Sequence, residues 1–375
     1  MTATKKLRVV ELYAGTGRSM EPFRRDKRFE PALLVDVSQR AKDTYLKNFP
    51  GANYALRDLE TLSPKKLLGL AGGEVDILLG CPPCQGYSDN GARLDSDPRN
   101  AHVNAFAAFV SALRPMAVAL ENVPLTVASD RFQAFLKSIE KAGYAWSAGV
   151  LNAALYGSCQ SRQRLIFVAI RNDLRQVPSI PKPTHGGGTC YSYHHQQSML
   201  IAEDARNILG LTPGSLRTQQ MVPESHQGML GKKWIPTVGE VLSGLPKARL
   251  ESGRVNGHSP WGHKEEVLKR MEGVPEGGQW TGDKKYFSQS YARLHRDGLA
   301  RTITRYFPNP GSGRFWHPTE NRSLTLREAA RIQGFPDSFQ FLEHATPGAN
   351  CDLVGNALDA RFAEVAYSAI QNSLN

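Results

Sequence analysis

The sequence predicts an α/β protein, with an open, doubly wound, mostly parallel sheet and a smaller, loop-rich domain inserted late in the chain. Short apolar runs that end at Gly, Pro or an acidic residue recur through the first 170 residues, which is typical of strands buried on both faces. Helix-like segments separate these runs, and this alternation indicates βαβ units. Beyond Pro181, Gly and Pro interrupt the chain often, which predicts loops.

The elements follow in chain order. The predicted strands are the apolar runs 7–15, 31–37, 75–80, 116–123 and 164–170. The predicted helices are 100–113 and 130–142 in the first half, and 325–333 and 357–371 after the loop-rich region. Because the last helix can pack back on the sheet, the large domain is expected to be discontinuous. We therefore divide the chain into a large domain at 1–180, a small domain at 181–345 and a returning segment at 346–375.

Composition excludes several classes of protein. The 375 residues are 41% hydrophobic and 22% charged, which fits an ordinary globular chain. No apolar run approaches the ~18 residues that a membrane-spanning helix needs, and the first residues lack the apolar stretch of a secretory signal. Five scattered cysteines do not make a disulfide framework, so we expect a cytoplasmic protein.

The positive charge lies mainly in the second half of the chain. The whole chain has 46 Lys and Arg against 35 Asp and Glu. Between Arg171 and Glu328 there are 22 basic and 14 acidic residues, so this stretch holds most of the surplus. A basic surface indicates a polyanion partner, with nucleic acid first among the candidates; on charge alone, a merely soluble basic protein is equally compatible.

A glycine turn follows the first predicted strand, at Tyr13, Ala14, Gly15, Thr16 and Gly17. Glycines at a strand-to-helix turn let a ligand approach the backbone closely. Asp36 ends the second apolar run, where an acid can bind ribose hydroxyls, and Asp58 lies where it could reach an adenine. The last glycine of the dinucleotide fingerprint is absent, which favours an adenosine cofactor without a pyrophosphate.

The sequence Cys81-Pro82-Pro83-Cys84 follows the third predicted strand directly. The carboxyl ends of such strands are where α/β proteins bind ligands. A thiolate there could be a nucleophile. Half of a zinc site, a redox pair and a pair of inert cysteines are the alternatives, although no second CxxC completes a zinc site.

Two further groups of polar residues flank later strands. Glu121 ends the run 116–123, where a carboxyl group could hydrogen-bond a heterocyclic nitrogen. Gln160, Arg162 and Arg164 alternate at period two, so they are predicted to share one face of an extended segment. Guanidinium groups there could hold an anion or a base carbonyl.

In this order, the motifs resemble those of the DNA (cytosine-5)-methyltransferase family over nearly the whole chain. YAGTG resembles the family's S-adenosylmethionine turn, PPCQGYS its nucleophile loop, ENV its glutamate motif and QSRQR its QxRxR motif. TLREAARIQGFPDSFQF and VGNAL resemble its last two motifs. The resemblance implies a class I, Rossmann-like methyltransferase fold with a target-recognition domain. Arg18 replaces a glycine common in the family, and GNALDA lacks the proline common after GN.

The resemblance also implies a role for each matching residue. Cys84 would be the nucleophile, Glu121 would contact the target cytosine, and Arg162 and Arg164 would hold the base. The implied DNA contacts are Gln85, Ser88 and Arg99. The residues implied to bind S-adenosyl-L-methionine, and its product S-adenosyl-L-homocysteine, are Tyr13, Ala14, Gly15, Gly17, Asp36, Val37, Asp58, Leu59, Pro82, Asn356 and Ala357.

The implied partner is double-stranded DNA, and no metal is expected; His194 and His195 resemble a solvated loop more than a metal site. We expect a monomer in the bacterial cytoplasm or nucleoid, with a cognate restriction endonuclease as a second candidate partner. One rival is a tRNA cytosine-5 methyltransferase, whose Cys-Phe-Thr stretch is not found in this sequence. The other is an inactive DNA-binding member of the family, which Cys84 and Glu121 argue against.

Overall fold

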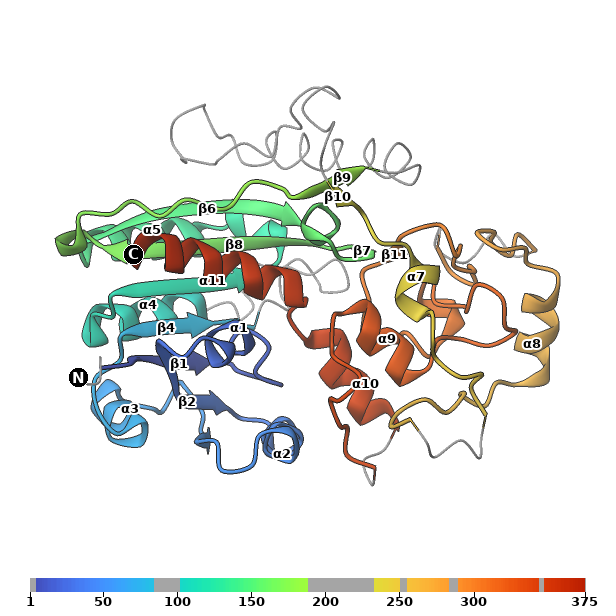
Figure 1. The fold of residues 1–375 in the computed structure, drawn as a ribbon, viewed down its shortest axis with the longest axis horizontal. Coiled ribbons are helices and arrows are strands. Elements are labelled where there is room, and N and C mark those ends of the chain that lie inside the picture. The colour runs from blue at the N-terminus through green and yellow to red at the C-terminus, as the bar shows by residue number, and fades with distance from the viewer. Residues whose placement is uncertain are drawn as a thin grey trace.

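A seven-stranded sheet forms the centre of the large domain (Figure 1). The structure is a computed structural model and describes residues 5–83, 102–187, 233–249, 255–282, 289–343 and 347–374. The strand order is β3-β2-β1-β4-β5-β8-β6. The strands are β1 (Leu7–Leu12), β2 (Phe29–Asp36), β3 (Tyr54–Leu56), β4 (Ile77–Gly80), β5 (Ala117–Asn122), β6 (Tyr144–Asn152) and β8 (Gln163–Arg171).

The predicted fold class is confirmed. The five strands from β3 to β5 are parallel, and the chain winds outward from β1 in both directions. β8 runs antiparallel to β5 and to β6. β6 was not among the predicted strands, because its sequence YAWSAGVLN lacks a continuous apolar run.

Alternate strand residues bury the two faces of the sheet against different helices. Val10 faces α3 (Pro64–Ala71), α4 (His102–Leu113) and α5 (Asp130–Lys141), whereas Val9 faces α1 (Glu21–Arg25), α2 (Gln39–Asn48) and α11 (Ala360–Leu374). This is the period-two alternation of a strand covered on both sides. The continuous apolar runs of the sequence follow from it.

Serine caps fix where several of these helices begin. The Oγ atoms of Ser38, Ser63 and Ser129 each accept a hydrogen bond from the backbone N–H of the third residue of the helix that follows, α2, α3 or α5. Such caps satisfy donors that a helix cannot satisfy itself, and each stabilises its helix by about 1 kcal/mol. The caps therefore fix the first residue of each of these helices.

The small domain, on the right of Figure 1, has its own apolar core. Phe307, Phe335 and Phe341 are almost completely buried there. α7 (Val238–Leu242), α9 (Leu326–Ile332), α10 (Pro347–Asn356) and β11 (Ala300–Arg301) contribute to this core, whereas α8 (Glu265–Glu272) packs in a separate cluster with Trp316. β11 pairs with β7 (Gln160–Ser161), and β9 (His185–Gly187) pairs with β10 (Lys233–Trp234) beside the large-domain sheet (Figure 1).

The segment after 345 divides between the two cores. α11 returns to the sheet, where Phe362 and Ile370 are buried. α10 instead packs beside α9, and its Cys351 and Val354 belong to the small-domain core. The expected segment 346–375 therefore does not pack as one unit. In the described part of the chain, no helix has both the length and the apolar character to cross a membrane.

Candidate functional site

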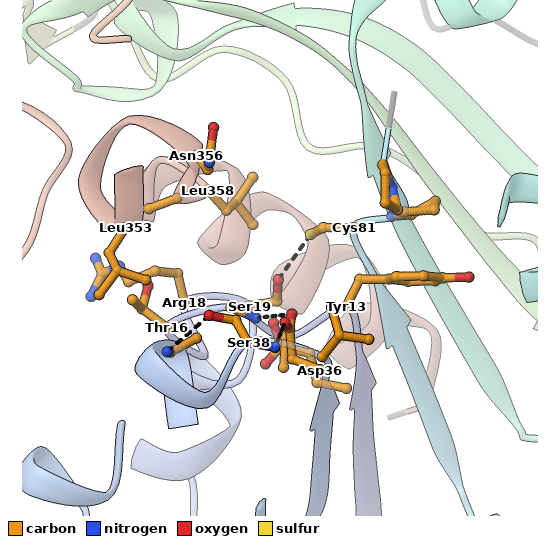
Figure 2. Close-up of a pocket in the computed structure, with 18 of the residues that line it drawn as sticks. Tyr13, Thr16, Arg18, Ser19, Asp36, Ser38, Cys81, Leu353, Asn356 and Leu358 are labelled. Carbon is orange, nitrogen blue, oxygen red and sulfur yellow. Dashed lines mark hydrogen bonds between the residues drawn. The ribbon is translucent and has the colours of Figure 1, made fainter. Parts of the chain in front are cut away.

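A cavity of about 700 Å³ lies at the carboxyl ends of β1, β2, β4 and β5. This is where the chain winds in two directions from β1, the usual ligand position in an open α/β sheet. The turn after β1 forms its floor, and α10 of the small domain closes one side (Figure 2). The site is therefore built between the two domains.

The turn after β1 is held open toward the cavity by Asp36. The backbone N–H of Gly15 donates to one carboxylate oxygen at 2.9 Å, and that of Ser38 donates to the other at 2.8 Å. Gly15 has φ +50°, and the position of a Cβ atom there is open space. Tyr13 also has a positive φ, +55°, which is rare for an aromatic residue and common at binding sites.

Gly17 differs from the other residues expected to bind a cofactor, because it is not part of the cavity lining. It has φ +70°, and a Cβ atom would lie 2.2 Å from Cε2 of the buried Tyr45 side chain. Packing beneath the turn therefore requires a glycine at this position.

The cavity wall next to β2 and β3 combines apolar and acidic groups. Val37 is 66% exposed although it is hydrophobic, and it lines the cavity with Asp58 and Leu59. Asp58 accepts a hydrogen bond from Glu60 N–H at 2.9 Å. An exposed apolar side chain beside a carboxylate suits the flat face and polar edge of a heterocycle.

The chain after β4 brings Cys81 and Pro82 to the cavity. The Asn122 amide donates to the Pro82 carbonyl at 3.3 Å, which ties this segment to β5. The Cys81 thiol lies 3.5 Å from the Ser19 hydroxyl. Burial, and then the nearby Glu121 carboxylate, raise the pKa of Cys81 well above its usual value, which disfavours the thiolate form. Cys84 lies outside the described residues.

Glu121 and Arg164 form an ion pair in the cavity wall beside Cys81. Arg164 Nε lies 2.9 Å from Glu121 Oε1, and both side chains are about 15% exposed. β5 and β8 are antiparallel neighbours here. The pairing presents a carboxylate whose orientation is set by a guanidinium at the cavity wall. Charge-assisted pairs of this kind hold their geometry well.

Arg162 points to a different neighbourhood from Arg164. It lines the cavity but is only 3% exposed. It donates to the carbonyls of Ile303 at 3.2 Å and Ala357 at 3.1 Å, so it ties the sheet to the small domain. Gln160 is fully buried and bonds Gln333 and Asp359. The three residues therefore do not present one common face to a ligand.

The small domain closes the cavity with the end of α10. Asn356 is exposed and Ala357 is buried, and both line the cavity. Gly355 lets the end of α10 pack closely against the backbone of Arg305, since a Cβ atom at this glycine would lie 2.2 Å from the Arg305 backbone N. Of the other predicted residues, Gln85, Ser88 and Arg99 lie outside the described residues, as do His194 and His195. Among the described residues, no cluster of His, Cys, Asp and Glu could hold a metal ion.

Sequence reasoning missed Glu11, which lies beneath the turn. Its carboxyl is 1% exposed, lines the cavity and accepts Met20 N–H at 3.1 Å. Burial raises the pKa of Glu11 to about 8. An acid inside the apolar run LRVVELYAG was the available signal, because a strand buried on both faces rarely holds one.

His102 was also missed. It begins α4, and its ring lies edge-on to Tyr13 with centroids 5.4 Å apart. Its Nδ1 lies 3.3 Å from the Tyr13 hydroxyl, and its Nε2 lies 3.6 Å from Glu60. Tyr13, Glu60 and His102 all line the cavity, so these three contacting polar side chains form part of one wall. Nothing in the local sequence joins residues so far apart in the chain.

Comparison with known proteins identifies a family. The family model for C-5 cytosine-specific DNA methylases matches residues 7–372. The chain is 28% identical to the type II methyltransferase M1.HphI of Haemophilus parahaemolyticus, over 97% of this chain and 86% of the relative. It is 27% identical to the type II methyltransferase M.AgeI of Thalassovita gelatinovora, over 89% and 92% of the two chains.

Solved structures show the same fold. A prophage-encoded DNA modification methyltransferase of E. coli has a TM-score of 0.71 and 23% identity, with 99% of this chain and 100% of that chain covered. The Dnmt2 methyltransferase of S. pombe has a TM-score of 0.64 and 17% identity, with 99% and 100% covered. At these identities the likeness concerns the fold.

Proposed function

Since the chain belongs to the C-5 cytosine-specific DNA methylase family and is therefore a C5 methyltransferase, we propose that it transfers a methyl group from S-adenosyl-L-methionine to C5 of a cytosine in duplex DNA. One observation carries this proposal. The Glu121–Arg164 pair, 2.9 Å apart, borders the same cavity as the Gly15–Asp36 turn and the segment that leads into Cys84. A base-directed acid and a nucleoside pocket thus share one space.

The cavity residues fit an adenosyl amino acid. A volume of about 700 Å³ is within the usual range for small-molecule sites. Open space beside Gly15 admits a ligand to the backbone. The Asp36 oxygens, each with one lone pair in use, can accept ribose hydroxyls with the other. Val37, Asp58 and Leu59 would border the base, and Asn356 and Ala357 the far end.

When bound, the cofactor supplies a methyl group activated on a sulfonium. The target carbon, however, is a poor nucleophile until the ring is activated. Cys84, as a thiolate, adds to C6 of the cytosine, so that electron density moves to C5. A covalent step of this kind divides one hard reaction into two easier ones. After the transfer, which leaves S-adenosyl-L-homocysteine, a water molecule takes the C5 proton, and the electrons of the C5–H bond restore the ring double bond and expel the Cys84 thiolate from C6.

Glu121 and Arg164 assist the addition. Glu121 holds a proton or a hydrogen bond at cytosine N3, which stabilises the charge that arrives when the thiolate adds. Arg164 fixes the carboxyl in place and supplies a positive charge beside the base. We propose that Arg162 acts indirectly, by holding the domains together, because Nη1 and Nη2 donate to the backbone carbonyls of Ile303 and Ala357.

The target cytosine must leave the stacked duplex to reach this cavity, at a cost of a few kcal/mol. We propose that the basic stretch after Arg171 holds phosphates and reads the recognition sequence, with Gln85, Ser88 and Arg99 nearer the target base. Phosphate contacts make binding steeply dependent on salt. The names of the type II relatives support a role in restriction–modification, with a cognate endonuclease as partner.

Expression in a host without cytosine methylation tests the proposal. Bisulfite sequencing of host DNA should show methylated cytosines within one recognition sequence, and the Cys84→Ser variant should leave none. Purified tRNA offered with labelled S-adenosylmethionine provides the competing substrate. Methylation of tRNA alone, or of neither nucleic acid by a folded protein, would refute the proposal.

A further inference from the structure

The Arg18 side chain extends from the turn after β1, which we call the cavity turn, to the small domain. The guanidinium donates to the carbonyl of Gly334 at 2.7 Å, across 316 residues of sequence. It also lies 4.5 Å from the centre of the Phe335 ring and pairs with Glu21 on α1. Arg18 itself is 4% exposed. One side chain thus joins the turn after β1 to the end of α9.

Both ends of this link are firmly held. Arg18 lies in the cavity turn, and the preceding residue, Gly17, packs against Tyr45. Gly334 follows Gln333, the C-cap of the small-domain helix α9, and Phe335 belongs to the small-domain core. A buried guanidinium is costly unless it is paired, so the Glu21 carboxylate and the Gly334 carbonyl keep it in this position. A shift of the small domain is therefore transmitted to the cavity turn.

We propose that Arg18 is a positioning residue that couples occupancy of the cofactor cavity to DNA binding by the small domain. The inference rests on the proposed function. A ligand on the turn fixes the backbone from which Arg18 departs, and DNA on the small domain fixes Gly334 and Phe335. Each ligand then binds more tightly when the other is present, and the two effects are equal by linkage.

A second interdomain contact provides the matched control. Lys47 on α2 donates to the carbonyl of Phe341 at 3.2 Å. Like Arg18, it sends a cation from the large domain to a backbone oxygen of the small domain. Lys47 does not line the cavity. Loss of this contact should weaken domain packing without touching the turn.

The experiment measures the Kd of S-adenosyl-L-homocysteine by calorimetry, without and with a saturating duplex that contains the methylation site found by bisulfite mapping. We expect the duplex to tighten binding at least about fivefold in the unaltered protein, at the lower end of typical coupling. Arg18→Met should reduce this factor below about twofold. Arg18→Lys, which keeps a cationic donor, should recover most of it, and Lys47→Met should leave it unchanged.

Thermal unfolding of each variant establishes that it is folded, and Arg18→Gln, too short to reach Gly334, replaces Arg18→Met should the latter not fold. An unchanged coupling factor in Arg18→Met would overturn the inference. So would an equal loss in Lys47→Met, or a duplex without effect in the unaltered protein. If the unaltered protein binds no S-adenosyl-L-homocysteine at all, the proposed function itself fails, and the inference fails with it.

Discussion

Gly17 can be separated experimentally from Gly15, although both belong to the same turn and both have positive φ angles of +70° and +50°. A Cβ atom on Gly17 would lie 2.2 Å from Tyr45 Cε2 and 2.9 Å from Leu34 Cδ2. Tyr45 is fully buried and cannot swing aside. A Cβ atom on Gly15 meets nothing within 4 Å. Alanine at the two positions should therefore have different costs.

Alanine at either position incurs the free-energy cost of a left-handed backbone, whereas only alanine at position 17 also incurs a cost for overpacking. A left-handed conformation costs an alanine about 1–2 kcal/mol, and overpacking a core adds about 1–3 kcal/mol. Gly15→Ala should then lose about 1–2 kcal/mol and Gly17→Ala about 2–5 kcal/mol. At about 2.1 cal/mol/K per residue, 1 kcal/mol corresponds to roughly 1.3 °C for a chain of this length. The melting temperatures should fall by about 1–3 °C and about 3–6 °C.

Differential scanning calorimetry gives the two melting temperatures, and titration with S-adenosyl-L-homocysteine gives the two affinities. Gly17→Ala should lose stability and, once folded, keep most of its affinity. Gly15→Ala should lose affinity at least tenfold with little loss of stability, because its methyl group enters the cavity. Equal falls in melting temperature, or a larger loss of affinity in Gly17→Ala, would show that the packing argument is wrong.

Three further predictions follow: two concern the reaction, and one concerns the pH dependence of stability. Cys81→Ser should keep most of the methylation activity while Cys84→Ser loses it, because a serine hydroxyl ionises far less readily than a thiol with a pKa of about 8.5 and is a much weaker nucleophile. A filter assay with labelled cofactor compares the two variants. Glu121→Gln should lower kcat at least tenfold, or about 1.4 kcal/mol of barrier, with little change in DNA affinity, and equal losses would make the Arg164 pair structural. Burial raises the pKa of Glu11 from 4.5 to about 8, so the folded protein keeps a proton that the unfolded chain releases, and stability falls as the pH rises between these values. Between pH 5.5 and 8 the melting temperature of the unaltered protein should therefore fall more than that of Glu11→Gln.

The sheet could be predicted from sequence because burial on both faces leaves a local record. Runs such as PALLV and ILLG contain no polar side chain, and the structure places them in β2 and β4. β6 left no such record. It lies at the edge of the sheet, and Ser147 and Gly149 occupy buried positions within it, so its buried residues do not form an apolar run.

The residues that line the cavity could be predicted from sequence where they lie at the carboxyl ends of strands. The Gly15–Asp36 hydrogen bond joins the ends of adjacent strands, and strand-end positions were the basis of that prediction. The partners of Arg162 are 141 and 195 residues away, and no local pattern separates Arg162 from Arg164. The roles of the two arginines therefore depend on how the domains pack, which period-two spacing does not record.

The small domain shows the same limit at its boundary. Composition changes at Pro181, but the core residues of this domain extend through Leu326, Ala329 and Val354 to Ala357, beyond the expected end at 345. A protein that received residues 181–320 from this chain would keep its own α9 and α10 against a foreign core. An exchange of 181–357 carries those helices with the loops they support. We expect the longer exchange to fold and to transfer the recognition sequence, as bisulfite mapping would show, whereas the shorter one should melt at a lower temperature. If both grafts are equally stable, α9 and α10 are not part of what holds the recognition surface together.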